Sequence, residues 1–246
     1  MSPQRRRAVL RNALGVGAAT GAYAVSFGAL SVAAHLSTVQ TMALSLLMFT
    51  GGSQFALVLV LGAGGSWPSA AGAAALLGSR NAFYGVRVSE LLERPKGWRR
   101  LLTAHFTIDE TTAMALAQEE PEAVRFAFWA TAISVFSLWN LGSLAGAIGA
   151  TLLPDPKVLG LDAAAPAAFL ALLAPRLRGR EPWLVAGAGA AVGLLLVPAV
   201  PAGVPVLVAA LVAVAAGLRG KPSRDPAAPP KPARDPAAPP KPEAPS

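Results

Sequence analysis

The stretch FTGGSQFALV, residues 49–58, places two adjacent glycines and two hydrogen-bonding side chains in the middle of an apolar tract. It lies inside a run from Asn12 to Ser79 that contains no Asp, Glu, Lys or Arg. Adjacent glycines weaken a helix, and Ser53 and Gln54 need hydrogen-bond partners wherever they are buried. The stretch therefore predicts a break in a hydrophobic segment, at a point where backbone groups are exposed.

The composition and the distribution of charge indicate a membrane protein. Of the 246 residues, 54% are hydrophobic and 14% are charged, whereas about a quarter of an ordinary soluble chain is charged. Residues 12–79, 126–154 and 182–218 carry no charge, and a helix needs roughly 20 apolar residues to cross a bilayer. An alanine-rich soluble bundle would need a charged face on each helix, which these tracts lack. The sequence therefore predicts an all-α polytopic membrane protein.

The positive charge is arranged as in a membrane protein and not as in a nucleic-acid-binding one. The net charge is +8, but most Lys and Arg residues lie in short clusters between apolar tracts, the pattern of cytoplasmic loops. These clusters are residues 5–11, 87–100, 176–180 and the tail from Arg219. We therefore expect both termini in the cytoplasm, an uncleaved first span, a lipid bilayer as surroundings and no nucleic acid partner. The chain has no cysteine, which excludes disulfides and thiolate metal sites.

The apolar segments outnumber the crossings that these clusters allow. Eight segments lie near residues 13–35, 42–62, 67–88, 101–118, 125–153, 158–175, 183–198 and 203–218. If all of them crossed, the basic cluster at 87–100 would lie outside the cell, and the same parity problem recurs before residue 176. Segment 42–62 contains the glycine pair, and segment 101–118 is short and polar. We therefore predict about six transmembrane helices plus two interrupted or re-entrant elements, a pairing typical of an inverted repeat.

The predicted organisation has three parts: a basic cytoplasmic N-terminus at 1–12, a transmembrane domain at 13–218 and a tail at 219–246. The nonapeptide RDPAAPPKP occurs twice in the tail. Proline at this density excludes helix and sheet, so we predict a disordered, basic, cytoplasmic extension.

Two polar segments carry charged residues within apolar surroundings. Arg80 and Tyr84 share one helical face, as do His105 and Asp109, with Glu110 to the side. A guanidinium can bind a carboxylate through two hydrogen bonds, and buried His, Asp and Glu residues can relay protons. Because a lone charge in the bilayer is costly, we expect Arg80 to lie within salt-bridge reach of Asp109 or Glu110. The alternatives are a purely structural ion pair and an interfacial helix with solvated charges.

Other functional classes have weaker support in the sequence. Ser53 with His105 as base, or the Asp109–Glu110 pair, would make an intramembrane enzyme, and an accessory membrane subunit is a third reading. No metal site is expected, because one His beside two carboxylates lacks ligand spacing. No cofactor is indicated, and the Walker motif is absent, so an ion gradient or a partner would supply the energy.

Four motifs in order resemble the AzlC/YgaZ family of branched-chain amino acid permeases. They are GGSQFA (51–56), SRNAFYG (79–85), TIDETTAMA (107–115) and LGLDAAAPAAFLALLAP (159–175). The resemblance extends from residue 13 to about 218. In the second motif, Gly78 and Asn81 stand where the family commonly has Asn and His, so a proton role for that His does not transfer.

The resemblance implies a non-enzymatic exporter of branched-chain and similar amino acids in the bacterial inner membrane. It also implies a small hydrophobic partner subunit of the AzlD/YgaH type. For a zwitterionic substrate we expect a binding site formed by Gly51, Gly52, Ser53, Gln54, Arg80, Asn81 and Tyr84, with Phe55 and Phe83 shaping its apolar part. We expect proton coupling by His105, Asp109 and Glu110.

Overall fold

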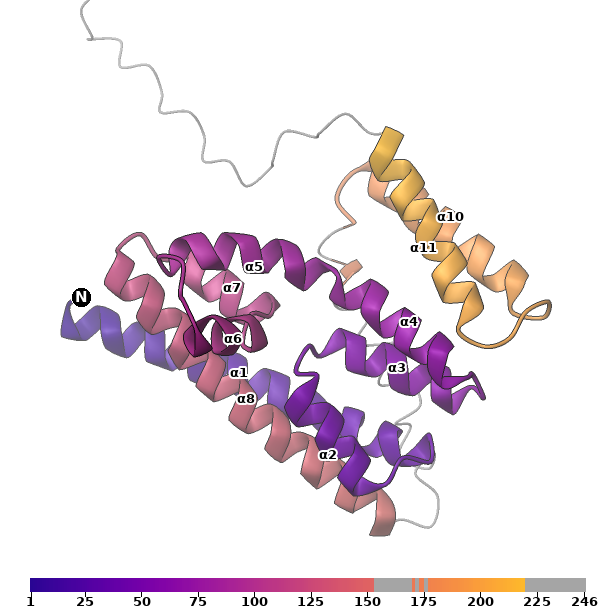
Figure 1. Cartoon of the computed structure of the whole chain (residues 1–246), viewed down its shortest axis with the longest axis horizontal. Coiled ribbons are helices and arrows are strands. Elements are labelled where there is room, and N and C mark those ends of the chain that lie inside the picture. Colours follow the sequence, from indigo (N-terminus) through magenta and orange to yellow (C-terminus); the bar gives the residue numbers. More distant parts are fainter. Residues whose placement is uncertain (153–169, 171–172, 175–176, 220–246) are drawn as a thin grey trace, which may run out of the picture.

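The computed structural model describes residues 1–152, 170, 173–174 and 177–219, and the described part is helical without strands (Figure 1). The helices are α1 (Pro3–Ala33), α2 (Thr38–Leu47), α3 (Gly52–Gly62), α4 (Trp67–Gly78), α5 (Arg80–Leu91), α6 (Trp98–His105), α7 (Asp109–Leu116), α8 (Pro121–Leu152), α10 (Arg180–Leu196) and α11 (Val204–Arg219). Among them, α1 and α8 have the length and composition that crossing a membrane requires. The architecture therefore agrees with the helical class predicted from the sequence.

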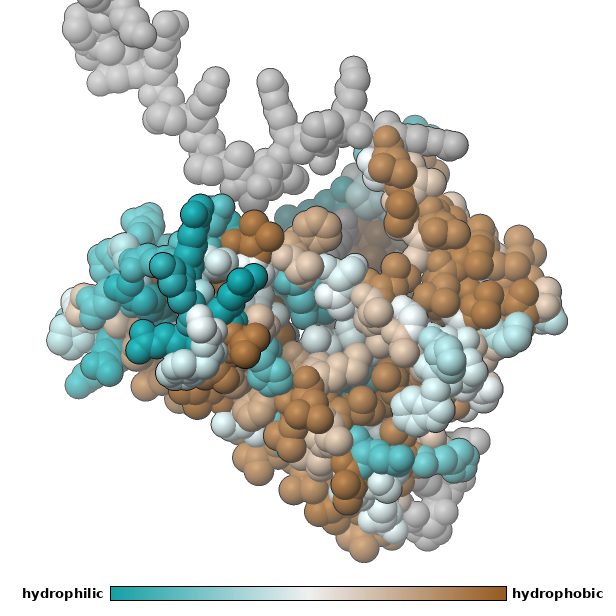
Figure 2. Space-filling view, in the orientation of Figure 1, coloured by the Kyte–Doolittle hydropathy of each residue, from teal (hydrophilic) through white to brown (hydrophobic). Residues whose placement is uncertain are grey.

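Helices α1 and α8 run parallel and in close contact along their length. At their N-terminal ends, the Met1 amine is 2.5 Å from a Glu122 oxygen, and further along Gly21 meets Leu138. A Cβ at Gly21 would lie 2.8 Å from the Leu138 carbonyl oxygen, so a glycine is required for this approach. We call the end that holds Met1 and the start of α8 the basic end, and Figure 2 shows hydrophilic residues gathered there.

Helices α2 and α3 form a hairpin that enters from the end opposite the basic end (Figure 1). Ser37 caps α2 next to the C-terminus of α1, and the Ser45 hydroxyl lies 3.2 Å from that of Ser143. The chain reverses at residues 48–51, and α3 then returns until Gly62 lies against Ala34. The predicted interruption of segment 42–62 is therefore present, and its second half runs back toward the end at which the first half entered.

Helices α4 and α5 lead from that end back to the basic end. Segment 67–88, predicted to be continuous, is divided at Ser79, whose hydroxyl donates to the Leu76 carbonyl at 2.7 Å. A serine that bonds back to the preceding turn bends a helix. The division places Arg80 at the first residue of α5, in the middle of the molecule.

Helices α6 and α7 form a second hairpin, which enters from the basic end. The link before α6 is held there by an ion pair of 2.8 Å between Glu93 and Arg125. His105, at the end of α6, reaches Phe49 of the first hairpin with a ring-centroid separation of 6.0 Å. Helix α7 then returns, and Ala115 packs in a cluster with Val124 near the start of α8. The predicted interruption of segment 101–118 is therefore also present.

The two hairpins occupy equivalent places in the chain order. Hairpin α2–α3 is followed by the long path α4–α5, and hairpin α6–α7 is followed by α8. The hairpin α2–α3 and the path α4–α5 both begin at the end opposite the basic end. The hairpin α6–α7 and helix α8 both begin at the basic end. This is the arrangement expected of an inverted repeat.

Helices α10 and α11 pack against each other, and α11 touches α4 where Leu207 lies near Gly72. The motif at 159–175 and the tail lie outside the described residues, apart from positions 170, 173, 174 and 219. The first described helix begins at Pro3, so the arginines of the N-terminal basic cluster lie on α1 itself.

Candidate functional site

The tips of the two hairpins meet in the middle of the molecule. Phe49 of the first tip packs against Phe106 of the second, with ring centroids 6.1 Å apart. Both rings also contact Phe136 of α8, at 5.0 and 5.3 Å. Contact between tips that enter from opposite ends places four helix ends at one point, and each helix end has backbone groups that need partners.

Both tips are closed by the same device, although their sequences differ. In the first tip, the Gly51 N–H donates to the Gln54 side-chain oxygen at 3.1 Å, and the Gln54 amide donates to the Leu44 carbonyl at 2.8 Å. In the second tip, the Ile108 N–H donates to the Thr111 hydroxyl at 3.0 Å, and that hydroxyl lies 2.7 Å from the Phe106 carbonyl. In each case the third residue of the second helix bonds back across the reversal.

This arrangement explains Gly51 and Gln54 of GGSQ. Gly51 has φ +59°, a conformation that glycine adopts at little cost. Gln54 is fully buried and stabilises the reversal. The first turn of α3, which starts at Gly52, therefore points its unbonded N–H groups toward the centre of the molecule.

A small, partly enclosed cavity lies between the two tips, α1, α5 and α8. Both tips and all three of these helices contribute residues to its lining, which consists of Thr20, Tyr23, Phe49, Thr50, Gly51, Gly52, Arg80, Ile108, Asp109, Glu110, Val135 and Trp139. Its volume of about 20 Å³ is enough for roughly one water molecule. Sites for organic ligands span about 300–1,000 Å³, so a ligand of amino acid size requires the tips to separate.

An ion pair crosses this cavity. An Arg80 guanidinium nitrogen lies 3.1 Å from an Asp109 carboxylate oxygen, and the two side chains are 26% and 23% exposed. The predicted pairing of Arg80 with one of the two acids is therefore present, and the partner is Asp109. The Arg80 Nε has no hydrogen-bond partner in the described part of the chain. The planar fork of the guanidinium thus retains a donor for a second acceptor.

Glu110 lines the same cavity in a different electrostatic setting. Among the described residues, the ion pairs do not include Glu110. The charged or titratable groups that act on the same space are Tyr23 from α1, Arg80 from α5 and Asp109 from its own helix. Glu110 therefore differs from Asp109 in having no ion-pair partner among the described residues.

His105 lies beside the cavity and does not line it. Its ring packs among Phe49, Phe106 and Phe136, with centroids 5.1–6.0 Å apart. The expectation that His105 and Asp109 share one helical face is wrong, because α6 ends at His105 and α7 begins at Asp109. The spacing of four residues is meaningful only on an uninterrupted helix.

The other predicted binding residues divide into two groups. Gly51, Gly52 and Arg80 line the cavity, whereas Ser53 and Gln54 are buried behind it. Asn81 and Tyr84 are half-buried on α5 and do not belong to the lining. Phe83 is 77% exposed, so the prediction that it shapes an apolar pocket is wrong.

The sequence interpretation missed the walls contributed by α1 and α8. Tyr23 and Trp139 meet edge to face at 5.2 Å, and both line the cavity. Phe27 and Phe55 extend this aromatic cluster behind them. One signal was available, because a tyrosine inside a charge-free tract is a polar group that needs a buried partner.

The enzymatic alternative that pairs Ser53 with His105 lacks the geometry that it needs. The Ser53 hydroxyl has no hydrogen-bond partner in the part of the chain that the structure describes. A nucleophile needs a base within about 3 Å, and His105 instead packs in the aromatic cluster of the tips. No group of three or more metal-binding side chains occurs among the described residues.

Comparison with protein families gives one match. The family model described as AzlC protein matches residues 15–153, which is more than half of the chain. The chain belongs to the AzlC family. The matched region runs from α1 to α8 and contains both hairpins, whereas α10 and α11 lie beyond it.

The AzlC family is a transporter family associated with branched-chain amino acid transport, and its members generally act with a small partner subunit. The match and the apolar helices together indicate a membrane protein. Curated proteins and solved structures gave no match to this AzlC-family chain.

Proposed function

We propose that this AzlC-family protein is a secondary transporter that exports branched-chain and related amino acids across the bacterial cytoplasmic membrane. The observation that carries the proposal is the Arg80–Asp109 ion pair in a small, partly enclosed cavity between two opposed hairpin tips. Half-helix ends that meet near the middle of a membrane are the usual binding sites of secondary transporters.

The cavity offers a complementary group for each part of an amino acid. The substrate carboxylate would take the place of Asp109 on Arg80 and accept N–H groups from the first turn of α3. The substrate ammonium would bind the released Asp109 together with Glu110. Tyr23 and Trp139 would form the apolar wall against which a branched side chain packs.

Proton coupling requires that the two carboxylates, Asp109 and Glu110, have different roles. Asp109 is paired with Arg80 in the empty site, and the substrate carboxylate would break this ion pair when it binds Arg80. Glu110 has no such partner among the described residues, and we assign proton exchange to it. His105, which lies outside the cavity, would influence the tips only by packing.

The proposed topology has crossings made by α1, α4–α5, α8, α10 and α11. The segment near 158–175, which completes the six crossings predicted from the sequence, lies almost wholly outside the described residues. The hairpin α2–α3 enters from outside and the hairpin α6–α7 enters from the cytoplasm. The basic end faces the cytoplasm because Lys and Arg are retained there. The small hydrophobic subunit of the AzlD/YgaH type would complete the transporter in the membrane.

Labelled leucine, isoleucine, valine and methionine provide the direct test in sealed vesicles, with and without a proton gradient, and with and without the small subunit. Arg80→Lys keeps the charge but loses the planar fork, so we expect transport to fall at least about tenfold, the equivalent of 1.4 kcal/mol. Arg87→Lys is the matched control, because Arg87 pairs with Glu90 on the surface of the same helix.

Transport at the native rate by Arg80→Lys would overturn the substrate role of Arg80. Glu110→Gln should transport at a rate that no longer changes with pH, while binding of leucine is retained. An unchanged pH profile in Glu110→Gln would remove Glu110 from the coupling mechanism and leave the substrate site standing.

A further inference from the structure

A group of unpaired cations lies on one short segment at the basic end. Three arginines at this end have carboxylate partners: Arg5 pairs with Glu120, Arg87 with Glu90 and Arg125 with Glu93. Within the described residues, the ion pairs do not include Arg94, Lys96, Arg99 or Arg100. The link before α6 and its first turn therefore hold the larger of two groups of cations without an ion pair at this end, the other group being Arg6, Arg7 and Arg11 on α1.

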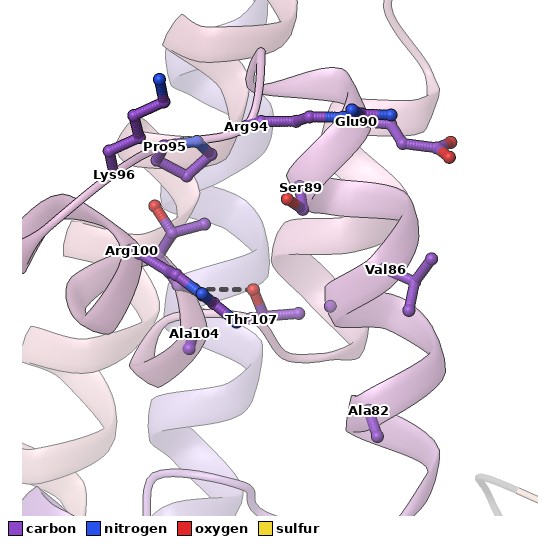
Figure 3. Close-up of a pocket in the computed structure, with 12 residues that line it drawn as sticks. Ala82, Val86, Ser89, Glu90, Arg94, Pro95, Lys96, Arg100, Ala104 and Thr107 are labelled. Atoms are coloured by element: carbon purple, nitrogen blue, oxygen red, sulfur yellow. Dashed lines mark hydrogen bonds between the residues drawn. The ribbon is translucent and has the colours of Figure 1, made fainter.

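Three of these cations, Arg94, Lys96 and Arg100, line a groove between α5 and α6 (Figure 3). The groove has a volume of about 670 Å³, and its rim is formed by Arg94, Lys96 and Arg100. Its interior is lined by small or apolar residues: Ala82, Gly85, Val86 and Ala104. A Cβ at Gly85 would meet nothing within 4 Å, so the absence of a side chain there leaves the groove open.

At the deep end of the groove, the Thr107 hydroxyl is not free to donate a hydrogen bond to a ligand. The Thr107 hydroxyl donates to the Thr103 carbonyl at 2.6 Å (Figure 3). The near end also lacks a free acid, because Glu90 is paired with Arg87. The groove therefore has a cationic mouth and an apolar interior, which suits an elongated molecule with an anionic head and a hydrocarbon body.

The opposite side of α6 has the same character. A second groove of about 660 Å³ is lined by Lys96, Arg99, Trp98 and Trp129, among others. Trp98 and Leu101 on α6 are 66% and 73% exposed, and the Arg99 guanidinium lies 5.8 Å from the Trp98 ring. Exposed tryptophan beside Lys and Arg marks the level of a membrane–water interface.

We propose that the groove between α5 and α6 binds an anionic phospholipid, with the phosphate between Arg94, Lys96 and Arg100 and an acyl chain along Ala82, Gly85 and Val86. An amino acid zwitterion does not fit this mouth, because the mouth offers cations without a free acid for the ammonium. The cytoplasmic leaflet supplies anionic lipid at the level where basic residues of membrane proteins lie.

The position of the groove gives the lipid a mechanical role. One wall of the groove is α6, the first half of the hairpin whose tip closes the central cavity. A lipid that joins α5 to α6 holds this hairpin against the path that carries Arg80. The binding site itself requires only that the basic end faces a leaflet with anionic lipid, and it is independent of the substrate.

Quenching of tryptophan fluorescence by brominated lipids tests the site in reconstituted protein. The reporter protein is Trp98→Phe/Val86→Trp, because Val86 lines this groove whereas Trp98 lines the second one. The signal assigned to the groove is the difference between this reporter protein and Trp98→Phe, in vesicles with brominated phosphatidylglycerol or brominated phosphatidylcholine. We expect the reporter protein to prefer phosphatidylglycerol by about fivefold or more, since one surface cation contributes about that factor. Excess glycerol phosphate in the buffer should not displace the lipid, because it has no chain for the groove.

Two charge variants complete the design. Arg94→Gln/Lys96→Gln/Arg100→Gln should reduce the preference to near unity, while Arg6→Gln/Arg7→Gln/Arg11→Gln removes equal charge from α1 at the same end and should keep it. Arg94→Lys/Arg100→Lys should also keep it, which separates charge from folding defects. Equal quenching by the two lipids in the reporter protein, survival of the preference when the first charge variant is made in it, or displacement by glycerol phosphate would overturn the proposal.

Discussion

The two hairpins share a geometry and differ in chemistry. Both reverse in the middle of the molecule, and both are closed by the third residue of their second helix, Gln54 in one and Thr111 in the other. The hairpin α2–α3 contains no charged residue, whereas α6–α7 carries Asp109 and Glu110 at its tip. The first hairpin thus contributes backbone N–H groups and shape to the cavity, and the second contributes ionisable groups. The same hairpin geometry therefore supplies backbone donors in one half of the protein and ionisable side chains in the other.

The largest expected effect concerns the sides of the membrane from which the two hairpins enter, which we expect to be opposite. The native chain has no cysteine, so single cysteines report cleanly. Ala63→Cys, in the link after α3, should react with an impermeant maleimide from outside sealed cells. Lys96→Cys, in the link before α6, should react only after the membrane is permeabilised. Reaction of both sites from the same side would refute the opposed arrangement.

A second test compares the contribution of the charges to folding. Asp109→Asn leaves Arg80 without its partner, and loss of one member of a buried pair costs about 3–5 kcal/mol. Because both side chains are about a quarter exposed, we expect the lower value, about 3 kcal/mol, in the free energy of unfolding in mixed micelles. Glu110→Gln, on the adjacent residue, should change this free energy little, because it removes no ion pair. A similar cost for both variants would show that the two acids share Arg80.

The smallest expected effect tests whether the two closing devices are equivalent. Gln54→Leu and Thr111→Val each leave a backbone N–H of the tip without its acceptor, at a cost of about 1–3 kcal/mol. Ser53→Ala and Thr112→Val are the neighbouring controls, because these two hydroxyls have no hydrogen-bond partner in the described structure. Their removal should be neutral or slightly stabilising. Thermal unfolding in detergent measures all four, and a cost in only one hairpin would show that the tips are not equivalent.

Much of this architecture is predictable from where charge is absent. The tracts without Asp, Glu, Lys or Arg indicate the class, and the position of the basic cluster at 87–100 indicates that one of the segments before it must turn back. The free-energy cost of leaving a guanidinium unpaired in an apolar medium correctly predicts that Arg80 pairs with an acid. These inferences succeed because the transfer of charge into an apolar medium dominates the other energies.

The details that failed depend on packing between distant segments. His105 was placed with Asp109 by helical spacing, but the break at 106–108 turns its ring into the aromatic cluster. Tyr23 and Trp139 were missed because they meet only when α1 and α8 lie in parallel. Phe83 was assigned to a pocket although α5 presents that face outward. A periodicity shows that a helix has faces, but its neighbours decide what each face contacts.

The glycine contacts between α1 and α8 have a consequence for motion. Where a backbone lies directly on another backbone, as at Gly21 and Leu138, no long side chain can change rotamer to absorb a displacement, so these two helices are poorly suited to sliding or rocking past each other. They therefore act as the stationary frame of the protein, and the short half-helices are its moving parts. Hinges are expected at residues 48–51 and 106–108, so conformational exchange measured by spin labels should be large between the two tips and small between α1 and α8.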